Sequence, residues 1–338
     1  MTQITIEGEK FYIDGKPTYA GQHYQDYEIE GLLLNSRMIQ ATFDDENPAT
    51  RGRWAYPDTK QWDADRNNRE FVAAVPTYRQ HGLLAVTVNF QGGSPEGYSK
   101  DQPWINSAFE VDGSFKPAYL DRMKRTIDAL KAAQMVAILG IFYFGQDERL
   151  VNEAAVKQAV DNAVEWVFAQ DYHNVLIEIN NECNIPAYEH EILRPHRVHE
   201  LIEQVKSHSH EGRRLLVGTS YGGGSIPTEN VVRGSDFLLM HGNGVSEPDR
   251  IAQMVDEARA VPGYQPMPIL FNEDDHFDFD QPYNNFIAAV SKGASWGYFD
   301  PGDNNYQDGY QSPPVQWGIN TPRKQGFFDL VRRMTQEE

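Results

Sequence analysis

Residues 175–182, Val-Leu-Ile-Glu-Ile-Asn-Asn-Glu, and residues 269–273, Ile-Leu-Phe-Asn-Glu, are two apolar runs that each end in an amide followed by a glutamate. A short apolar run that is bounded by polar residues is typical of a strand buried in a parallel sheet. The two runs therefore predict two buried strands, each followed at its carboxyl end by a glutamate.

Six further runs of this kind lie before, between and after these two. The eight predicted strands cover residues 37–43, 83–90, 136–142, 175–180, 215–219, 237–241, 269–272 and 294–299. Polar loops and helical patterns separate them, and that alternation is typical of βαβ units.

The helical patterns between the strands complete an α/β fold. Leu120, Met123 and Ile127 recur at helical spacing, and Pro248 is placed to open another helix. Pro76 lies inside the predicted helix 68–80, where we expect a kink or an early end. Eight strands that alternate with helices predict a (β/α)8 TIM barrel. An open doubly wound sheet is the alternative, but no glycine-rich turn follows the first strand.

The first 30 residues have a different pattern. Ile4 to Ile6 and Phe11 to Ile13 alternate in polarity, and Asp14-Gly15 is a turn signal. We predict a short antiparallel β-hairpin extension, residues 1–30, that caps one end of the barrel. We expect residues 1–338 to form one domain.

Composition excludes some classes of partner. The chain has 338 residues and a formal net charge of −19, which argues against binding to nucleic acid or to an anionic membrane. Cys183 is the only cysteine, so no intrachain disulfide can form. No run approaches the roughly 18 apolar residues of a membrane span. The start lacks the features of a signal peptide, so we expect a cytoplasmic protein if the chain is complete, and a secreted or periplasmic one if a signal peptide was removed. The sequence does not indicate an oligomeric state.

Polar and aromatic residues follow the predicted strands where a TIM barrel holds its active site, at their carboxyl ends. The candidates are Asn89 and Gln91 after strand two, Asn181 and Glu182 after strand four, His241 on strand six, Glu273 after strand seven, and Trp296 and Tyr298 on strand eight. Two glutamates at opposite strands can approach each other across the barrel mouth, as the hydrolysis of a glycosidic bond requires.

This arrangement resembles the clan A glycoside hydrolases. The resemblance lies in Asn181-Glu182 after strand four and Glu273 after strand seven, within an eight-strand count. It implies a retaining O-glycoside hydrolase that acts on an oligo- or polysaccharide, with Glu182 as acid/base and Glu273 as nucleophile, and it implies no cofactor and no metal. It also implies that Asn181 contacts the sugar, and that His241 and an aromatic residue on strand eight line the site.

Several of these residues have a structural interpretation as well. His241 could be a structural histidine, and Trp296 could be a core residue. Two long loops, residues 44–67 and 91–116, supply Trp54 and Trp104, which we predict to bind sugar, although ordinary loop packing is an equal alternative.

Two other functions remain open. A metal-dependent hydrolase on the same barrel would need histidine ligands, and the first strand has no His-x-His pair. The acidic loop 274–280 could bind calcium, but it lacks the spacing of an EF-hand, so a solvated loop is the preferred interpretation. A non-catalytic carbohydrate-binding barrel is the other alternative. Both carboxylates of the catalytic pattern argue against it.

Overall fold

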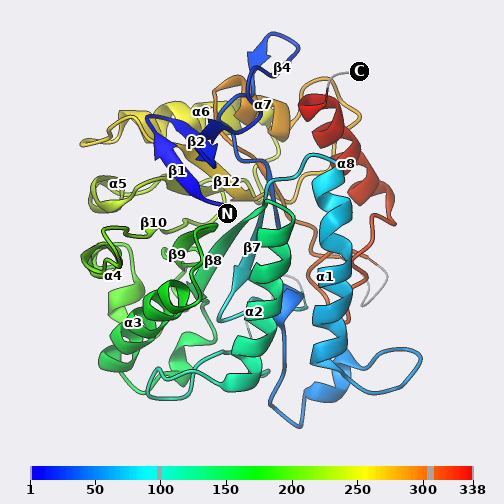
Figure 1. Ribbon diagram of the computed structural model, residues 1–338, viewed down its shortest axis with the longest axis vertical. Helices are drawn as coiled ribbons and strands as arrows, with labels where there is room; N and C mark the ends of the chain where they lie inside the picture. The colour runs from blue at the N-terminus through cyan, green and yellow to red at the C-terminus, as the bar shows by residue number, and fades with distance from the viewer. Residues whose placement is uncertain (1, 97–100, 303–307, 337–338) are drawn as a thin grey trace.

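Parallel strands surrounded by helices make up the fold (Figure 1). The computed structural model describes residues 2–96, 101–302 and 308–336. The parallel strands are β6 (Asn35–Arg37), β7 (Ala85–Asn89), β8 (Val136–Phe142), β9 (Val175–Asn180), β10 (Leu216–Gly218), β11 (Leu238–His241), β12 (Ile269–Glu273) and β13 (Gly297–Tyr298). The helices are α1 (Ala64–Gln80), α2 (Pro117–Ala132), α3 (Glu153–Ala169), α4 (His199–Ser207), α5 (Glu229–Gly234), α6 (Pro248–Ala260), α7 (Asn285–Ser291) and α8 (Pro322–Thr335).

The strands close into a ring. Six of them form one sheet in the order β10-β9-β8-β7-β6-β13, and β11 pairs with β12. Ser295, just before β13, exchanges backbone hydrogen bonds with β12 at Ile269 and Phe271. On the other side, the backbone N–H of Asp236 donates to the carbonyl of Val217 (2.9 Å) and links β11 to β10. The predicted (β/α)8 barrel is therefore confirmed.

The two faces of the strands have different environments. Outward residues such as Val86, Val88 and Ile177 pack in one large core with the helices. Inward residues at the amino ends of the strands form a smaller apolar core. It contains Leu33, Leu84, Ala85, Val136, Ile138, Leu176, Phe237, Leu239 and Leu270. This smaller core is the floor of the barrel. Toward the carboxyl ends of the strands the inward residues are polar, so polar side chains gather at that end of the barrel.

The N-terminal extension covers the floor of the barrel. Strands β1 (Ile4–Glu7), β2 (Lys10–Ile13) and β3 (Lys16–Pro17) form an antiparallel sheet, and β4 (His23–Tyr24) pairs with β5 (Tyr27–Glu28). Ile4 and Phe11 pack into the apolar floor, and the Phe11 ring meets Phe237 edge-on at 6.3 Å. The predicted antiparallel N-terminal extension is confirmed.

Two local predictions were wrong. The first barrel strand spans Asn35–Arg37, and the predicted strand residues Ile39–Thr42 form a 3-10 helix instead. Their carbonyls accept side-chain donors from α1, among them Asn67 and Asn68, so they need no partner strand. Of the two expectations at Pro76, the early end was wrong, because helix α1 continues through Pro76 to Gln80. Pro76 is exposed, so the carbonyl that loses its helical partner can be hydrated.

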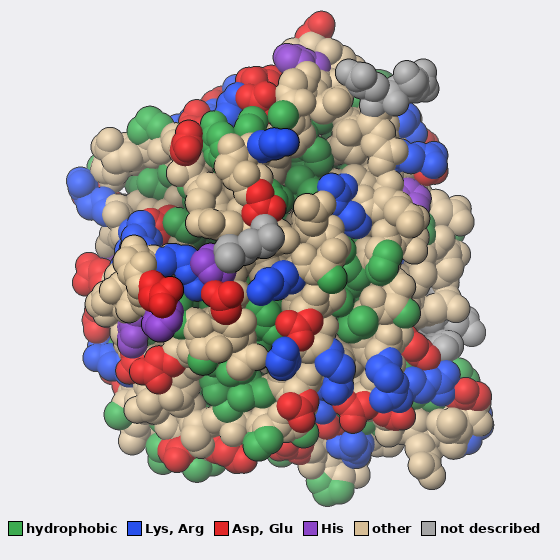
Figure 2. Space-filling view, in the orientation of Figure 1, with side chains coloured by type: hydrophobic (Ala, Val, Ile, Leu, Met, Phe, Trp, Pro, Cys, Tyr) green, Lys and Arg blue, Asp and Glu red, His purple; other side chains and the backbone are tan. Residues whose placement is uncertain are grey.

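The surface shows no single dominant charge on the face in view. Figure 2 shows acidic and basic side chains intermixed over it, although acidic residues outnumber basic ones, 49 to 30, in the whole chain. Within the described residues, none of the helices has the length and apolar character that a membrane span requires.

Candidate active site

Three ionisable side chains meet at the carboxyl ends of β9, β11 and β12. His241 Nδ1 lies 2.9 Å from Glu182 Oε1 and 3.5 Å from Glu273 Oε2. One carboxylate oxygen of each glutamate and the histidine nitrogen all lie within 4.8 Å of one another. The structure thus brings together Glu182, His241 and Glu273, which the sequence placed on three separate strands.

Glu273 is held on both oxygens. Arg37 Nε, at the end of β6, lies 2.8 Å from Oε2, and Asn243 Nδ2 donates to Oε1 at 2.6 Å. The glutamate is only 4% exposed, so these contacts define its orientation with little competition from water. Sequence reasoning missed both partners. The one available signal was a charged residue, Arg37, directly before an apolar stretch.

Burial and charge act against each other on this cluster. Burial raises the pKa of Glu273 above its ordinary value, while Arg37 and His241 oppose that rise. Burial alone would lower the pKa of His241, but the carboxylates of Glu273 and Glu182 outweigh it, and the histidine pKa lies above its ordinary value. The two carboxylates therefore favour the charged form of His241, which lies between them.

Glu182 has an unusual backbone. Its φ is +51°, in the left-handed region, and its N–H donates to Ser220 Oγ at 2.9 Å. A non-glycine residue in this region costs about 1–3 kcal/mol, so the surrounding structure must hold it there. The turn directs the carboxyl toward His241 and leaves 13% of the side chain exposed. Glu182 is thus the member of the cluster that solvent reaches most easily.

Asn181 offers unused hydrogen-bonding capacity beside Glu182. The residue is fully buried, and neither polar atom of its amide has a hydrogen-bond partner among the described residues. Its backbone is anchored, because its N–H donates to the carbonyl of Phe142 at the end of β8. A buried amide with no partner is costly, so this side chain is suited to a ligand that supplies one.

The two residues predicted from strand two differ in their roles. Asn89 points into the barrel, where its amide covers Gly140 of β8, and it is buried without a hydrogen-bond partner in the described structure. Gln91 is engaged in loop structure instead. Its Nε2 donates to Ser107 Oγ and to the Gln146 carbonyl, and its Oε1 accepts from the Tyr143 N–H. Gln91 therefore organises the loop and does not face the carboxylates.

The prediction that Trp296 and Tyr298 line the site was wrong. Trp296, which directly precedes β13, and Tyr298 within it point to the same side, as alternation predicts, but that side is the outer one. Trp296 stacks on Phe286 of α7 at 4.8 Å, and its Nε1 donates to Asp274 Oδ2 at 2.9 Å. Tyr298 stacks on Phe327 of α8 at 4.7 Å. Both rings are fully buried, so neither can stack on a sugar.

Trp54 and Trp104 are also unavailable to a sugar. They are fully buried and meet edge-to-face at 5.8 Å within a separate aromatic cluster of the long loops. The members of that cluster are Phe43, Trp54, Tyr56, Trp62, Ala64 and Trp104. Trp54 Nε1 donates to Asp45 Oδ2 at 2.8 Å, which anchors the ring. The alternative of ordinary loop packing describes both tryptophans. Residues 97–100 of the second loop lie outside the described residues.

The acidic loop after Glu273 has partners of its own. Asp274 Oδ1 accepts from His276 Nδ1 at 2.6 Å, and Oδ2 accepts from Trp296 Nε1 and from Asn285 Nδ2. Donors on both oxygens leave little coordination capacity for a cation. Asp274 therefore connects the end of β12 to α7 and β13.

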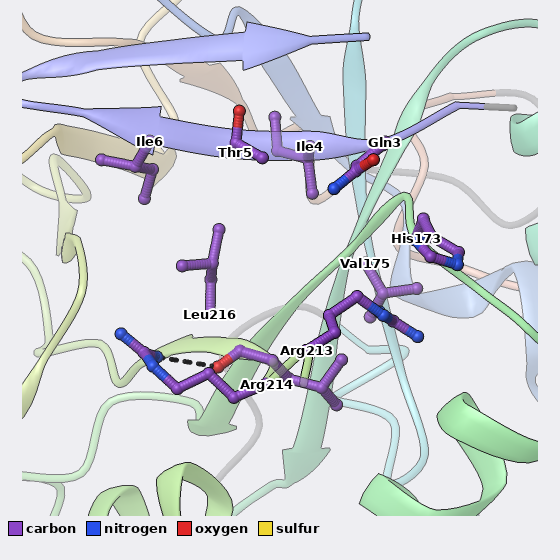
Figure 3. Close-up of a pocket in the computed structure, with 10 residues that line it drawn as sticks. Gln3, Ile4, Thr5, Ile6, His173, Val175, Arg213, Arg214 and Leu216 are labelled. Atoms are coloured by element: carbon purple, nitrogen blue, oxygen red, sulfur yellow. Dashed lines mark hydrogen bonds between the residues drawn. The ribbon is translucent and has the colours of Figure 1, made fainter. Parts of the chain in front are cut away.

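A separate pocket lies at the other end of the barrel. Figure 3 shows it between β1 and the amino ends of β9 and β10, where Ile4, Val175 and Leu216 line it. Its two arginines have partners, because Arg213 donates to the Tyr172 carbonyl and Arg214 pairs with Asp236. Barrel enzymes place their chemistry at the opposite end of the strands, so this pocket is not the candidate active site.

Comparison with solved structures agrees with the fold. No family model and no curated protein sequence matches the chain. Its structure is similar to that of the endo-1,4-β-mannanase of Rhizomucor miehei (TM-score 0.59, 12% identity, 98% of each chain covered). It is also similar to a family 5 glycoside hydrolase of Bacteroides vulgatus (TM-score 0.61, 12% identity, 96% of this chain and 70% of that one).

A third similar structure contains a sugar. It is a variant of a family 5 glycoside hydrolase of Prevotella bryantii in complex with a xyloglucan tetradecasaccharide (TM-score 0.55, 11% identity, 88% of this chain and 95% of that one). The chain spans only about half the length of two other matched structures, 54% and 51%. The predicted resemblance to clan A glycoside hydrolases is confirmed for the fold.

Proposed function

We propose that this protein is a retaining O-glycoside hydrolase in which Glu273 is the nucleophile and Glu182 is the general acid/base. The observation that carries the proposal is the approach of the two carboxylates to within 4.8 Å at the carboxyl end of the barrel. Retaining glycosidases hold their carboxyl groups about 5–5.5 Å apart, whereas inverting ones need about 6.5–9.5 Å to admit a water.

The surroundings of each glutamate suit its role. Glu273 must be ionised to attack the anomeric carbon, and Arg37 and Asn243 stabilise that ionised form through contacts of 2.8 and 2.6 Å. Glu182 must deliver a proton to the leaving oxygen, and His241 Nδ1 at 2.9 Å connects it to a group that can share that proton. In the second step Glu182 removes a proton from water, which then breaks the glycosyl–Glu273 bond.

Asn181 is placed to recognise the sugar. Its amide directly precedes the acid/base and has no hydrogen-bond partner among the described residues, so a sugar hydroxyl would supply the missing hydrogen bonds once substrate binding uncovers this fully buried side chain. In retaining enzymes a contact to the 2-hydroxyl strengthens in the transition state. We propose a carbohydrate substrate, an oligo- or polysaccharide, and the sugar complex of the similar Prevotella structure supports that class.

A metal-dependent hydrolase is the rival that the cluster itself raises. Glu182, His241 and Glu273 have the spacing of a metal site. However, the Arg37 guanidinium lies 2.8 Å from Glu273 Oε2, and Asn243 occupies the other oxygen, so a cation there would face a fixed positive charge. Measurement of bound metal in the purified protein, together with activity in a chelator, separates the two functions.

The experiment is a screen on aryl glycosides and plant or algal polysaccharides, followed by proton NMR of the first product formed. We expect the product to keep the anomeric configuration of the substrate. Glu273→Gln should reduce turnover to background, and Glu182→Gln should reduce it by about 10²–10⁴-fold. Glu189→Gln, the same change at an exposed position on the loop after Glu182, is the matched control and should leave turnover unchanged.

Azide adds a test that separates the two roles. With an activated substrate, azide should restore turnover to Glu182→Ala by attacking the glycosyl–Glu273 intermediate, which releases the Glu273 carboxylate and yields a glycosyl azide of retained configuration. In Glu273→Ala azide would instead attack the substrate directly and displace the aglycone, so the glycosyl azide should have inverted configuration. Near-normal turnover in either glutamine variant would refute the assignment. Sugar binding without bond cleavage in the wild type would favour the non-catalytic carbohydrate-binding barrel.

A further inference from the structure

Three consecutive glycines follow β10 and lie near the candidate catalytic pair. They are residues 222–224, here called the glycine loop, and the proposed two-carboxylate mechanism gives them no role. The segment just before them supports the acid/base, because Ser220 Oγ accepts from the N–H of Glu182 at 2.9 Å. Glycine loses more conformational freedom on folding than any other residue, so three in a row at this place need a structural reason.

Hydrogen bonds fix the path of the glycine loop. The N–H of Gly222 donates to Asn184 Oδ1 at 2.7 Å, and its carbonyl accepts from the N–H of Ser225 at 3.0 Å. The N–H of Gly224 donates to the carbonyl of His241 at 3.2 Å. Gly223 lies between these anchors, so the loop cannot withdraw at Gly223 without lengthening at least one of them.

The three glycines meet different requirements. Gly224 has a φ of +74°, in the left-handed region that favours glycine. A Cβ atom at Gly222 would have its nearest contacts at 3.5 Å, which is ordinary packing. A Cβ atom at Gly223 would lie 2.0 Å from the carbonyl oxygen of Asn243 and 3.1 Å from its Cβ, although Cβ atoms need at least 3.0 Å. The approach of Gly223 to Asn243 therefore requires a residue without a side chain.

Asn243 connects this approach to the proposed nucleophile. Its Nδ2 donates to Glu273 Oε1 at 2.6 Å. The residues on either side of it are bound to the same segment, because the N–H of Gly242 donates to the carbonyl of Glu273 at 2.8 Å and the N–H of Gly244 donates to Asp275 Oδ1 at 3.1 Å. Asn243 is thus enclosed between the glycine loop and the end of β12.

A side chain at Gly223 would disturb that enclosure. The Cβ atom and the Asn243 carbonyl oxygen would have to separate by about 1 Å, and the obstacle is backbone, not the end of a flexible side chain. A displacement of that size would stretch the 2.6 Å hydrogen bond between Asn243 and Glu273 beyond effective range. Gly223 itself is exposed, so a methyl group there removes no core packing.

We propose that Gly223 is a positioning residue whose missing side chain lets Asn243 lie close enough to Glu273 to hold the nucleophile. The inference rests on the proposed function, because it takes Glu273 as the nucleophile. Its test therefore includes a measurement that does not need turnover.

The test compares Gly223→Ala with the wild type. The amide of Asn243 stabilises the ionised form of Glu273, so the titration midpoint of Glu273 should rise by about one pH unit when the contact is stretched. Carbon-13 NMR of labelled glutamate carboxyl groups follows the titration, and the Glu273 resonance is the one that disappears in Glu273→Gln. With a cleavable substrate, kcat/KM should fall by about 10–100-fold, and its acid limb should move to higher pH.

A double variant shows whether the effect passes through Asn243. Arg37 on β6, His241 on β11 and Glu182 after β9 are the charged groups that also act on Glu273. In an Asn243→Ala background, Gly223→Ala should cause no further shift of the Glu273 midpoint. A shift as large as in the wild-type background would overturn the proposal, because it would show a route through one of those other groups.

Gly222→Ala is the matched control. It adds the same methyl group to the preceding residue of the loop, where the Cβ atom fits by ordinary contacts. We expect it to leave the Glu273 midpoint unchanged. An equal shift in Gly222→Ala and Gly223→Ala would count against the proposal, because any change in the loop would then have the same effect.

Two outcomes in Gly223→Ala itself would also overturn the proposal. An unchanged midpoint would show that the loop yields and Asn243 stays in place. Loss of folding, measured by circular dichroism, would show that the close approach serves the fold instead of the site. If the wild type cleaves no glycoside, the proposed function fails, whereas the NMR titration still decides whether Gly223 controls the contact between Asn243 and Glu273.

Discussion

Arg37→Met should change both the pH profile and the stability of the protein. The substitution keeps an unbranched side chain in the barrel but removes the charge whose Nε lies 2.8 Å from Glu273 Oε2. Both groups are at least 95% buried, so water replaces the lost contact poorly. Burial already raises the pKa of Glu273. In the variant, Glu273 also loses Arg37, which opposes that rise more strongly than His241 does.

The magnitude follows from Coulomb's law. A charge pair at about 4 Å and an effective dielectric constant of about 20 interacts by about 4 kcal/mol, which corresponds to about 3 pKa units. Measured effects of a neighbouring arginine on a carboxyl are about 1–3 units. We therefore expect the pKa of Glu273 to rise by a further 1–3 units or so. The acid limb of kcat/KM, which reports the ionised nucleophile in the free enzyme, should move to higher pH by that amount.

The loss of unfolding free energy in Arg37→Met should also depend on pH, and it should be larger at high pH than at low pH. A carboxyl whose folded-state pKa is raised favours folding at low pH, and that contribution is lost as the pH rises through the raised value. Breaking a buried ion pair costs about 3–5 kcal/mol when the remaining charge stays ionised. The deficit in unfolding free energy of Arg37→Met should thus be small near pH 5 and approach that range at pH 8. Denaturant unfolding at the two pH values measures it.

Arg37→Lys is the control, because it keeps the charge and should keep most of the acid limb in place. An acid limb in Arg37→Met that coincides with that of the wild type would refute the reasoning, since it would show that Arg37 does not support the ionised form of Glu273. A stability deficit that is equal at pH 5 and pH 8 would show a loss of packing instead of a loss of charge.

Three further variants test the placement of single side chains. Asn243→Ala removes the 2.6 Å donor to Glu273 Oε1 and should lower kcat/KM by about 10–100-fold in steady-state assays, with thermal stability retained. Trp54→Ala should lower the unfolding free energy by about 3–5 kcal/mol and leave the KM of the remaining folded enzyme unchanged. Trp296→Phe deprives Asp274 of a donor and should cost about 1–3 kcal/mol in denaturant unfolding. If either tryptophan variant had a raised KM and unchanged stability, that ring would bind the sugar instead of packing in the core.

The sequence was sufficient for the barrel because apolar runs of parallel strands contrast strongly with the loops around them. It was least reliable where the barrel interior is polar. Asn35 and Arg37 point inward on β6, so this strand lacks a continuous apolar pattern, and the sequence pattern favours the apolar residues that follow it. The positions of Glu182 and Glu273 followed from the ends of well-defined strands.

The side chains around the glutamates were harder to predict. Alternation shows that Trp296 and Tyr298 share a face, but it does not show which face meets the helices. Arg37 and Glu273 are 236 residues apart in the chain, and contacts across such a distance leave no local pattern. The loop aromatics were ambiguous for another reason, because a long loop needs its own small core and tryptophan serves that need as well as it serves a sugar.

Closure of the ring has a consequence for how the protein is made. Ser36 Oγ donates to the carbonyl of Tyr298, so the first and last strands of the barrel join residues 262 positions apart. While the chain leaves the ribosome, β6 has no neighbour on one side until nearly all of the protein has been synthesised. A chain that ends before Gly297 lacks β13, so it cannot form the parallel pairing of Asn35 and Ser36 with Gly297 and Tyr298 that closes the ring.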